Sequence, residues 1–299
     1  MPDLDLAGTY TALATPFTAD GSAIDWASWE KLVQSQIDAG VAGVIPCATT
    51  GESATLLDSE DRELVTRTVA QARGRVKVIA GTGTNSTAHT IELTRQAFEA
   101  GADAAMLVMP YYNKPSQEGL LRHVTLVAEA APGPLVLYNI PGRVVIELSV
   151  ETLLRILDLC PNVVALKDAS GNVLYCQELL TQAKGRVTVL SGDDPLTLPL
   201  VSVGAKGVIS VTSNIYPRAV NELVERALRG DLEGARERHL ALYAVNRALF
   251  TEPNPAPVKA ALAARGIFAH RTLRPPLVEA SPTCRARLAE VMAAYEARG

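Results

Sequence analysis

The stretch Ala39-Gly-Val-Ala-Gly-Val-Ile45 returns almost unchanged later in the chain as Val203-Gly-Ala-Lys-Gly-Val-Ile209. In both copies a glycine closes a segment with helical periodicity, and a short apolar run follows. A glycine in this position is typical of a helix that ends in a left-handed turn. An apolar run without alternation is typical of a parallel strand covered on both faces. The repeated stretch therefore predicts a helix that leads into a buried parallel strand.

The same unit recurs along most of the chain. Segments with helical periodicity separate eight short apolar runs, which cover residues 9–14, 41–46, 76–81, 104–109, 135–139, 163–168, 187–192 and 207–211. Eight strand–helix units with right-handed crossovers predict a closed (β/α)8 TIM barrel, an α/β fold, over residues 1–230. An open, doubly wound sheet is the alternative. Residues 231–299 show no strand pattern, so we expect them to form an appended C-terminal helical subdomain.

The composition is that of a large folded chain with a slight negative charge. The 299 residues include 28 Lys and Arg against 32 Asp and Glu, a net charge of −4, and 48% are hydrophobic. The absence of a basic block argues against a nucleic-acid partner. The four cysteines lack the spacing of a zinc ribbon or a disulfide framework. Without a signal-peptide pattern or an apolar run near about 18 residues, we expect a cytoplasmic protein with no membrane partner.

Polar residues close several of the apolar runs, and in barrels of this kind the active site lies at the carboxyl ends of the strands. The polar ends are Thr49-Thr-Gly-Glu-Ser53, Pro110-Tyr-Tyr-Asn-Lys-Pro115, Tyr138-Asn-Ile-Pro-Gly-Arg143, Lys167-Asp-Ala-Ser-Gly171 and Ser191-Gly-Asp-Asp194. Hydroxyls, phenols, a lysine and an arginine are therefore expected to meet at one mouth of the barrel.

Lys167 is the candidate nucleophile of this mouth. At a pKa near 10.4, only about one lysine amine in 2,500 is neutral at pH 7, but desolvation among the apolar residues of its own strand would lower that pKa. The structural alternative is a rim lysine that pairs with Asp168. Tyr138, one strand earlier, could exchange protons with the carbinolamine that a lysine forms with a ketone. The two residues together indicate imine chemistry.

Three further polar residues extend this interpretation. Arg143 is placed to hold a carboxylate in a bidentate pair, although a surface charge is the alternative. Thr49 and Thr50 offer hydroxyls to an acid group or a proton relay, unless they only start a helix.

The four histidines lack metal-ligand spacing, and Gly81-Thr-Gly83 lacks the third glycine of a dinucleotide site. We therefore expect neither a metal nor a nucleotide cofactor.

These motifs resemble the dihydrodipicolinate synthase/N-acetylneuraminate lyase family of class I, Schiff-base aldolases. The resemblance runs from about Tyr10 to the C-terminal helices. The strings that carry it are Thr49-Thr-Gly-Glu-Ser-Ala-Thr-Leu, Pro110-Tyr-Tyr-Asn-Lys-Pro-Ser-Gln-Glu-Gly, Leu137-Tyr-Asn-Ile-Pro-Gly-Arg, Leu166-Lys-Asp-Ala-Ser-Gly-Asn, Leu190-Ser-Gly-Asp-Asp, Gly207-Val-Ile-Ser-Val-Thr-Ser-Asn and Glu252-Pro-Asn-Pro-Ala-Pro-Val-Lys.

The resemblance implies roles for the catalytic residues. Lys167 forms the imine with pyruvate, and no external cofactor is needed because the protonated imine is the electron sink. Tyr138 is the general acid and base. Thr49 and Tyr112 complete a hydroxyl relay, and Tyr112 is expected to cross from a neighbouring subunit of a homotetramer built from dimers.

It also implies the substrates. Thr50 and the backbone of Ile209 would hold pyruvate, Gly192 would contribute to substrate binding, and Arg143 would meet the carboxylate of the aldehyde. An arginine after Tyr-Asn-Ile-Pro-Gly resembles the synthase branch, which condenses pyruvate with L-aspartate 4-semialdehyde to 4-hydroxy-tetrahydrodipicolinate, on the diaminopimelate route to lysine. The alternatives are another pyruvate aldolase, acting on N-acetylneuraminate or a 2-keto-3-deoxy sugar acid, and a barrel that binds a keto acid without turnover.

The chain departs from the family pattern at two places. Synthases usually continue from the arginine with Thr-Gly, whereas here Val144 and Val145 follow, and loss of a hydroxyl there could loosen aldehyde specificity. At the expected lysine-feedback site, Ser53, Ala54, Asn85 and Tyr111 match, but lysine-inhibited members place histidines and a glutamate where this chain has Asp58, Asp61 and His89. Without the glutamate to meet the ligand's ammonium group, we expect weak or absent lysine inhibition.

Overall fold

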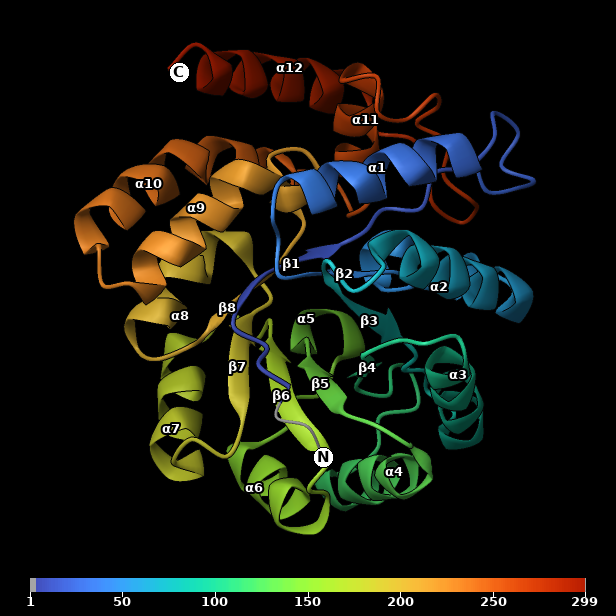
Figure 1. The fold of residues 1–299 in the computed structure, drawn as a ribbon, viewed down its shortest axis with the longest axis vertical. Coiled ribbons are helices and arrows are strands. Elements are labelled where there is room, and N and C mark those ends of the chain that lie inside the picture. Colours follow the sequence, from blue (N-terminus) through green and yellow to red (C-terminus); the bar gives the residue numbers. More distant parts are fainter. Residues whose placement is uncertain (1–3, 299) are drawn as a thin grey trace.

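The computed structural model describes residues 4–298 and contains a closed barrel of parallel strands in the order β1 to β8 (Figure 1). The strands are β1 Gly8–Ala12, β2 Gly43–Ile45, β3 Lys77–Gly81, β4 Ala104–Val108, β5 Leu135–Asn139, β6 Val163–Asp168, β7 Thr188–Ser191 and β8 Gly207–Ser210. The barrel closes where Tyr10 of β1 pairs with Ile209 of β8. The predicted TIM barrel is confirmed, and the open doubly wound sheet is wrong.

Each of the eight predicted runs overlaps one strand, and the ends differ by at most two residues. The second run was expected to reach Pro46, but β2 stops at Ile45 because proline has no N–H to donate to a ladder. The first run was expected to reach Ala14, but β1 stops at Ala12. The amide of Ala14 donates to the side chain of Asn214, at 3.1 Å, instead of to a neighbouring strand.

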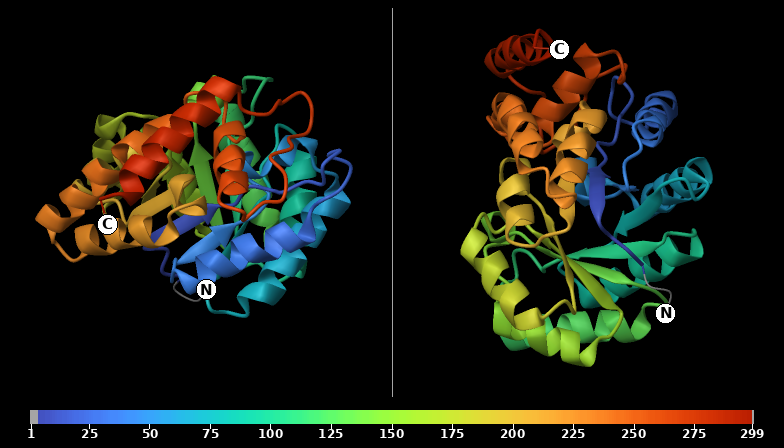
Figure 2. Two further views of the ribbon diagram at one scale, coloured as in Figure 1. Left: turned by 90° about the horizontal axis from the view of Figure 1, so that it is seen from above. Right: turned by 60° about the vertical axis from the view of Figure 1, so that its left-hand side comes forward.

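Helices surround the barrel and fill the connections between strands (Figures 1 and 2). The connecting helices are α1 Trp26–Asp38, α2 Asp58–Ala72, α3 Thr87–Glu99, α4 Gln117–Ala130, α5 Pro141–Val144, α6 Val150–Leu159, α7 Val173–Ala183, α8 Thr197–Ser202 and α9 Pro217–Leu228. Several begin at a side-chain cap, as when Asp25 accepts a hydrogen bond from the Ser28 amide at 3.2 Å. Gly40 has a left-handed φ of 72° after α1, as the sequence predicts.

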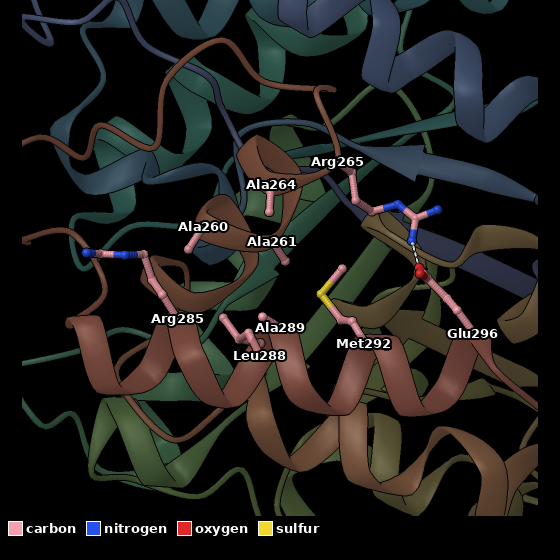
Figure 3. A pocket seen from close by; sticks show the side chains of 10 residues that line it. Ala260, Ala261, Ala264, Arg265, Arg285, Leu288, Ala289, Met292 and Glu296 are labelled. Carbon is pink, nitrogen blue, oxygen red and sulfur yellow. Dashed lines mark hydrogen bonds and ion pairs between the residues drawn. The ribbon is translucent and has the colours of Figure 1, made fainter.

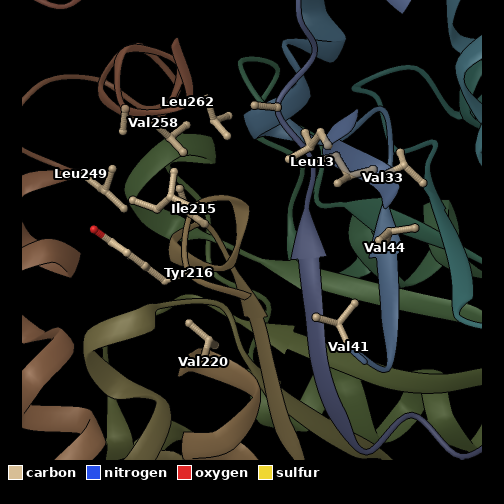
Figure 4. Packing of buried hydrophobic residues seen from close by; sticks show 14 of the residues in the cluster. Leu13, Val33, Val41, Val44, Ile215, Tyr216, Val220, Leu249, Val258 and Leu262 are labelled. Carbon is tan, nitrogen blue, oxygen red and sulfur yellow. The ribbon is translucent and has the colours of Figure 1, made fainter. Parts of the chain in front are cut away.

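Three helices follow the barrel: α10 Leu232–Ala248, α11 Ala256–Ala264 and α12 Pro282–Glu296. Their buried side chains join those of α1, β2 and α9 in one continuous apolar cluster (Figure 4). In this cluster Val258 and Leu262 of α11 lie in the same core as Leu13, which follows β1. The division of the chain at residues 230 and 231 stays a prediction.

The inside of the barrel has its own packing. Its buried core includes Tyr10, Ile79, Met106, Tyr138 and Ile209, which come from five different strands. Because side chains alternate along a strand, Ala165 and Lys167 of β6 point the same way. Lys167 therefore lies at the carboxyl end of a barrel interior that apolar side chains fill. Within residues 4–298, none of the helices has the length and apolar character that a membrane crossing requires.

Candidate active site

Lys167 and Tyr138 meet at the carboxyl end of the barrel. The two residues are register partners on β6 and β5. The Lys167 Nζ lies 4.0 Å from the centroid of the Tyr138 ring, and the two residues are only 5% and 4% exposed. The residue that follows Lys167 takes no part in this contact, since the carboxylate of Asp168 accepts from the amide of Ser170 at 2.9 Å.

The surroundings of Lys167 favour its neutral form. Burial lowers its pKa from 10.5 to about 7, the positive charge of Arg143 lowers it as well, and the carboxylate of Asp194 acts in the opposite direction. About half of the amines are then neutral at pH 7, against about one in 2,500 for an ordinary lysine. The desolvation that the sequence predicts for this strand is therefore the main influence on the pKa of the lysine.

Gly192, which follows β7, leaves room for the lysine. A Cβ at this position would lie 2.8 Å from the Cβ of Ala169 and 3.1 Å from the Cε of Lys167. Contacts of this kind are shorter than ordinary van der Waals separations. Gly192 was predicted to bind substrate. The geometry gives it a steric contribution in addition, because any side chain there would press on Lys167.

Tyr138 is a phenol that stays protonated at neutral pH. Burial raises its pKa to about 12, while Arg143 and a contact with the Thr49 hydroxyl lower it and Asp193 raises it further. The contact with Thr49 links the phenol to the loop that follows β2. The charge of Arg143 thus lowers the pKa of both Tyr138 and Lys167, as expected for groups that meet at one mouth.

The loop after β2 is held by a buried ion pair. Thr49–Gly51 form a short 3-10 turn, η1, and Glu52 follows with a left-handed φ of 58°. The Glu52 carboxylate accepts from the Nζ of Lys259 on α11 at 2.6 Å, and both side chains are completely buried. The other oxygen of Glu52 accepts from the amide of Arg274 at 3.0 Å. The C-terminal segment therefore fixes the turn that carries both threonines.

The sequence patterns predicted no role for the residues of this support, nor for Asn254. The Nδ2 of Asn254 donates to the Oγ1 of Thr50 at 3.0 Å, and its backbone carbonyl accepts from the guanidinium of Arg143 at 3.3 Å. The only signal in the sequence was the string Glu252-Pro-Asn-Pro-Ala-Pro-Val-Lys259, which carries the resemblance but lies outside every strand end.

Asp194 closes one of the polar strand ends, Ser191-Gly-Asp-Asp194, but the sequence predicted no individual role for it. It is buried, and its carboxylate accepts from the hydroxyl of Ser210 at 2.5 Å and from the amides of Val211 and Thr212 at 2.9 and 3.1 Å. Burial raises its pKa, and these hydrogen bonds lower it. Asp194 thereby ties the loop after β7 to the end of β8, where Ile209 is buried in the barrel interior.

A cavity of about 500 Å³ opens beside these residues. Thr49, Arg143 and Asn254 contribute to its wall, and so do all five residues expected at a feedback site, Ser53, Ala54, Asn85, His89 and Tyr111. The Nε2 of His89 lies 3.1 Å from the carboxylate of Asp58, and burial raises the pKa of Asp61 to about 7. Thr49, Arg143 and the candidate feedback residues therefore share one continuous hollow, whereas Lys167 and Tyr138 are not among the residues that line it.

Tyr112 differs from the other candidates because it is 89% exposed. Its φ of 74° and the φ of 46° at Lys114 are left-handed, a strained conformation for residues other than glycine. Val144, in the turn after Arg143, is buried, whereas Val145 is exposed.

A second hollow, of about 460 Å³, lies between α11 and α12 and is lined mainly by alanines, Leu288 and Met292 (Figure 3). Its charged groups include Arg265 and Glu296, which pair with each other. It has no candidate nucleophile, so the chemistry belongs to the mouth of the barrel. Among residues 4–298, no three His, Cys, Asp or Glu side chains gather in a way that could hold a metal ion.

The chain forms a closed (β/α)8 barrel, and at its mouth a lysine with a pKa of about 7 lies beside a phenol. These are the features of a lyase that works through an imine. Comparison with known proteins gives the family. The chain matches the Dihydrodipicolinate synthetase family over residues 5–295, and it belongs to that family. The family and the lyase class predicted from the sequence are confirmed.

Relatives and solved structures agree with this assignment. The 4-hydroxy-tetrahydrodipicolinate synthase of Sorangium cellulosum is 56% identical over 298 residues, covering 100% of this chain and 99% of the relative. The structure of the 4-hydroxy-tetrahydrodipicolinate synthase of Methylacidiphilum fumariolicum SolV is 42% identical and superposes with a TM-score of 0.96, over 98% of this chain and 97% of the other. The dihydrodipicolinate synthase of Aquifex aeolicus is 43% identical, with a TM-score of 0.94, over 97% and 98% of the two chains.

Proposed function

We propose that the protein catalyses the aldol condensation of pyruvate with L-aspartate 4-semialdehyde to 4-hydroxy-tetrahydrodipicolinate, the reaction of diaminopimelate and lysine biosynthesis. The synthase names of its relatives support this activity. The observation that carries the proposal is the buried amine of Lys167, whose pKa is lowered to about 7 next to the Tyr138 ring. We also propose a cytoplasmic location, as for other enzymes of amino-acid biosynthesis.

In this proposal, the neutral amine of Lys167 adds to the ketone carbon of pyruvate, and the ketone oxygen leaves as water. The phenol of Tyr138, protonated at neutral pH, gives and takes the protons of this step, and Thr49 links it to a relay. The imine acidifies the methyl group, whose proton is removed to give an enamine. The enamine carbon adds to the aldehyde, and the amino group of the bound aldehyde then displaces Lys167 and closes the ring.

Binding groups follow from the same arrangement. We propose that Thr50, the backbone of Ile209 and Gly192 hold pyruvate, and that Arg143 pairs with the carboxylate of the aldehyde. No external cofactor is required, because the electrons of the new carbon–carbon bond come from the enamine on the lysine. An arginine at this position suits a carboxylate better than the polyol chain of a sugar acid, so the other pyruvate aldolases are not favoured.

We propose that Tyr112 completes the relay of a neighbouring subunit in a homotetramer built from dimers. The high exposure of this tyrosine and its strained left-handed backbone support a role outside its own chain. Sedimentation of the wild-type protein and of Tyr112→Phe, together with their turnover, tests this assignment. A monomer that turns over at full rate would contradict it.

Borohydride trapping tests the chemistry. Incubation with pyruvate and borohydride should add one reduced pyruvate to the peptide that contains Lys167, and Lys167→Met should not be labelled. Coupled assays with L-aspartate 4-semialdehyde and with N-acetylneuraminate then separate the two aldolase activities. An unlabelled wild-type protein would overturn the imine, and turnover of the sugar acid alone would overturn the synthase.

A further inference from the structure

We propose that Asn254 is a positioning residue for pyruvate: its side-chain amide donates to the hydroxyl of Thr50 and so directs the hydrogen of that hydroxyl toward the carboxylate of pyruvate. The inference rests on the proposed function, because it takes Thr50 as a group that binds this carboxylate. It assigns a role in substrate binding to the segment between α10 and α11, which lies outside all eight strand ends.

The contact between the two residues is buried and well defined. The Nδ2 of Asn254 lies 3.0 Å from the Oγ1 of Thr50, and the two residues are 6% and 2% exposed. The segment that carries Asn254 is anchored five residues later, where Lys259 forms the buried ion pair with Glu52. Glu52 in turn follows the 3-10 turn that carries Thr50. The ion pair between Lys259 and Glu52 therefore anchors the segments that carry both partners.

The direction of this hydrogen bond matters for the chemistry. A hydroxyl has a single hydrogen, and a carboxylate can only accept hydrogen bonds. When Thr50 accepts from an amide N–H, its own hydrogen is free for another acceptor. Among the hydrogen bonds of residues 4–298, none has the Thr50 hydroxyl as donor. An incoming carboxylate therefore finds a donor that is already oriented.

Packing alone does not account for an amide at this position. The Oδ1 of Asn254 is buried and has no hydrogen-bond partner among the described residues. A buried acceptor without a partner lowers stability, and such groups call for an explanation. The contact between the Nδ2 of the same amide and Thr50 supplies an explanation. Thr50 needs a donor at this place, and an asparagine that provides the donor also carries an oxygen that has no partner.

The side chain and the backbone of Asn254 act on different residues. Its backbone carbonyl accepts from Arg143 at 3.3 Å, and a change of side chain does not remove that carbonyl. Substitutions at position 254 are therefore expected to weaken pyruvate binding and to leave binding of the aldehyde, assigned to Arg143, nearly unchanged. A general loss of structure would affect both substrates.

The test uses Asn254→Ala, Asn254→Asp, Thr50→Val and the two double variants. Asn254→Asp replaces the donor with an acceptor, so the Thr50 hydrogen turns away from the substrate. The pyruvate concentration for half-maximal borohydride trapping is measured at pH 9, where Lys167 is largely neutral, with the KM of each substrate and the melting temperature. Asn162→Asp is the matched control, because its buried amide donates to the Ala128 carbonyl at 2.9 Å, before β6 begins.

We expect Asn254→Asp to raise the pyruvate requirement by about tenfold or more, the effect of losing one hydrogen bond to a charged group. Asn254→Ala should raise it by less, the KM of the aldehyde should change less than about twofold, and neither substitution should add to Thr50→Val. Asn162→Asp should lower the melting temperature alone.

Two results would contradict the inference. If the pyruvate requirement of both Asn254 variants is unchanged, or if their effects add to that of Thr50→Val, Asn254 does not act through Thr50. Failure of the proposed function looks different, because wild-type protein would then not be labelled by pyruvate at all, and this inference would fall with it.

Discussion

The amine of Lys167 rests against the ring of Tyr138, 4.0 Å from its centroid, and not against a carboxylate. An adjacent carboxylate would hold the amine in its charged form, whereas burial leaves it close to neutrality. Among residues 4–298, Asp194 is the one acidic group that raises the pKa of Lys167 noticeably, and burial outweighs it. The mouth of the barrel thus keeps the amine of Lys167 partly neutral at a pH at which most lysines are fully charged.

The rate of imine trapping with pyruvate should rise with pH through about 7, following deprotonation of Lys167. Arg143→Gln should move this profile to higher pH, because the charge of Arg143 lowers the pKa of Lys167. The rate of borohydride labelling between pH 5 and 10 measures both profiles. Arg155→Gln, which breaks a surface pair with Glu118, is the control and should leave the profile in place. If Arg143→Gln leaves the pH profile of labelling unchanged, the charge of Arg143 does not lower the pKa of Lys167.

Lys167→Met should stabilise the protein at pH 6 by about 5 kcal/mol. The folded-state pKa of Lys167, about 7, lies below its ordinary value of 10.5. The unfolded chain therefore binds the extra proton between these values, and the stability of the wild-type protein rises with pH across this window. The gain from the substitution should be largest below pH 7 and should fade toward pH 10.5.

Denaturant unfolding of both proteins at pH 6, 8 and 10 measures this difference. Lys31→Met, on the exposed surface of α1, serves as control and should change stability little at any of these values. A gain for Lys167→Met that does not vary with pH would show that the charge of the lysine is not its source.

Lys259→Met should destabilise the protein by about 3 to 5 kcal/mol, because it leaves the carboxylate of Glu52 buried without its cation. Lys259→Met combined with Glu52→Leu should cost less than Lys259→Met alone, since both charges are then removed. Denaturant unfolding of the two single variants and the double variant gives the coupling. If the two losses simply add, the pair does not act as a unit.

Lysine should inhibit the enzyme weakly or not at all. The ammonium group of the ligand would meet His89 instead of an acid, and the Nε2 of His89 is already engaged with Asp58 at 3.1 Å. Initial rates across a lysine titration measure this. His89→Glu should increase inhibition, because it places a carboxylate at position 89, in addition to those of Asp58 and Asp61 in the cavity wall. Strong inhibition of the wild-type protein at low lysine would refute the prediction.

The local pattern of the chain was sufficient for the barrel and for part of the site. Apolar runs and glycine stops are local signals, so the eight strands follow from them. Lys167 and Tyr138 could be paired because residues that end neighbouring parallel strands arrive at one rim. The burial that depresses the lysine pKa could also be read from its apolar strand.

The support of the site could not be predicted in this way. Asn254 meets Thr50 across 204 positions of sequence, and Lys259 meets Glu52 across 207. No periodicity connects such pairs, because the path of the chain between α10 and α11 depends on how the last helices pack on the barrel. The roles given to the individual site residues remain predictions.

The ion pair between Glu52 and Lys259 has a consequence for the order of events during synthesis of the chain. The last strand is complete at Ser210, but the partner that fixes the threonine turn is added only at residue 259. A nascent chain that has just released its eighth strand from the ribosome still lacks Asn254 and Lys259. Competence to capture a keto acid is therefore one of the last properties this polypeptide acquires.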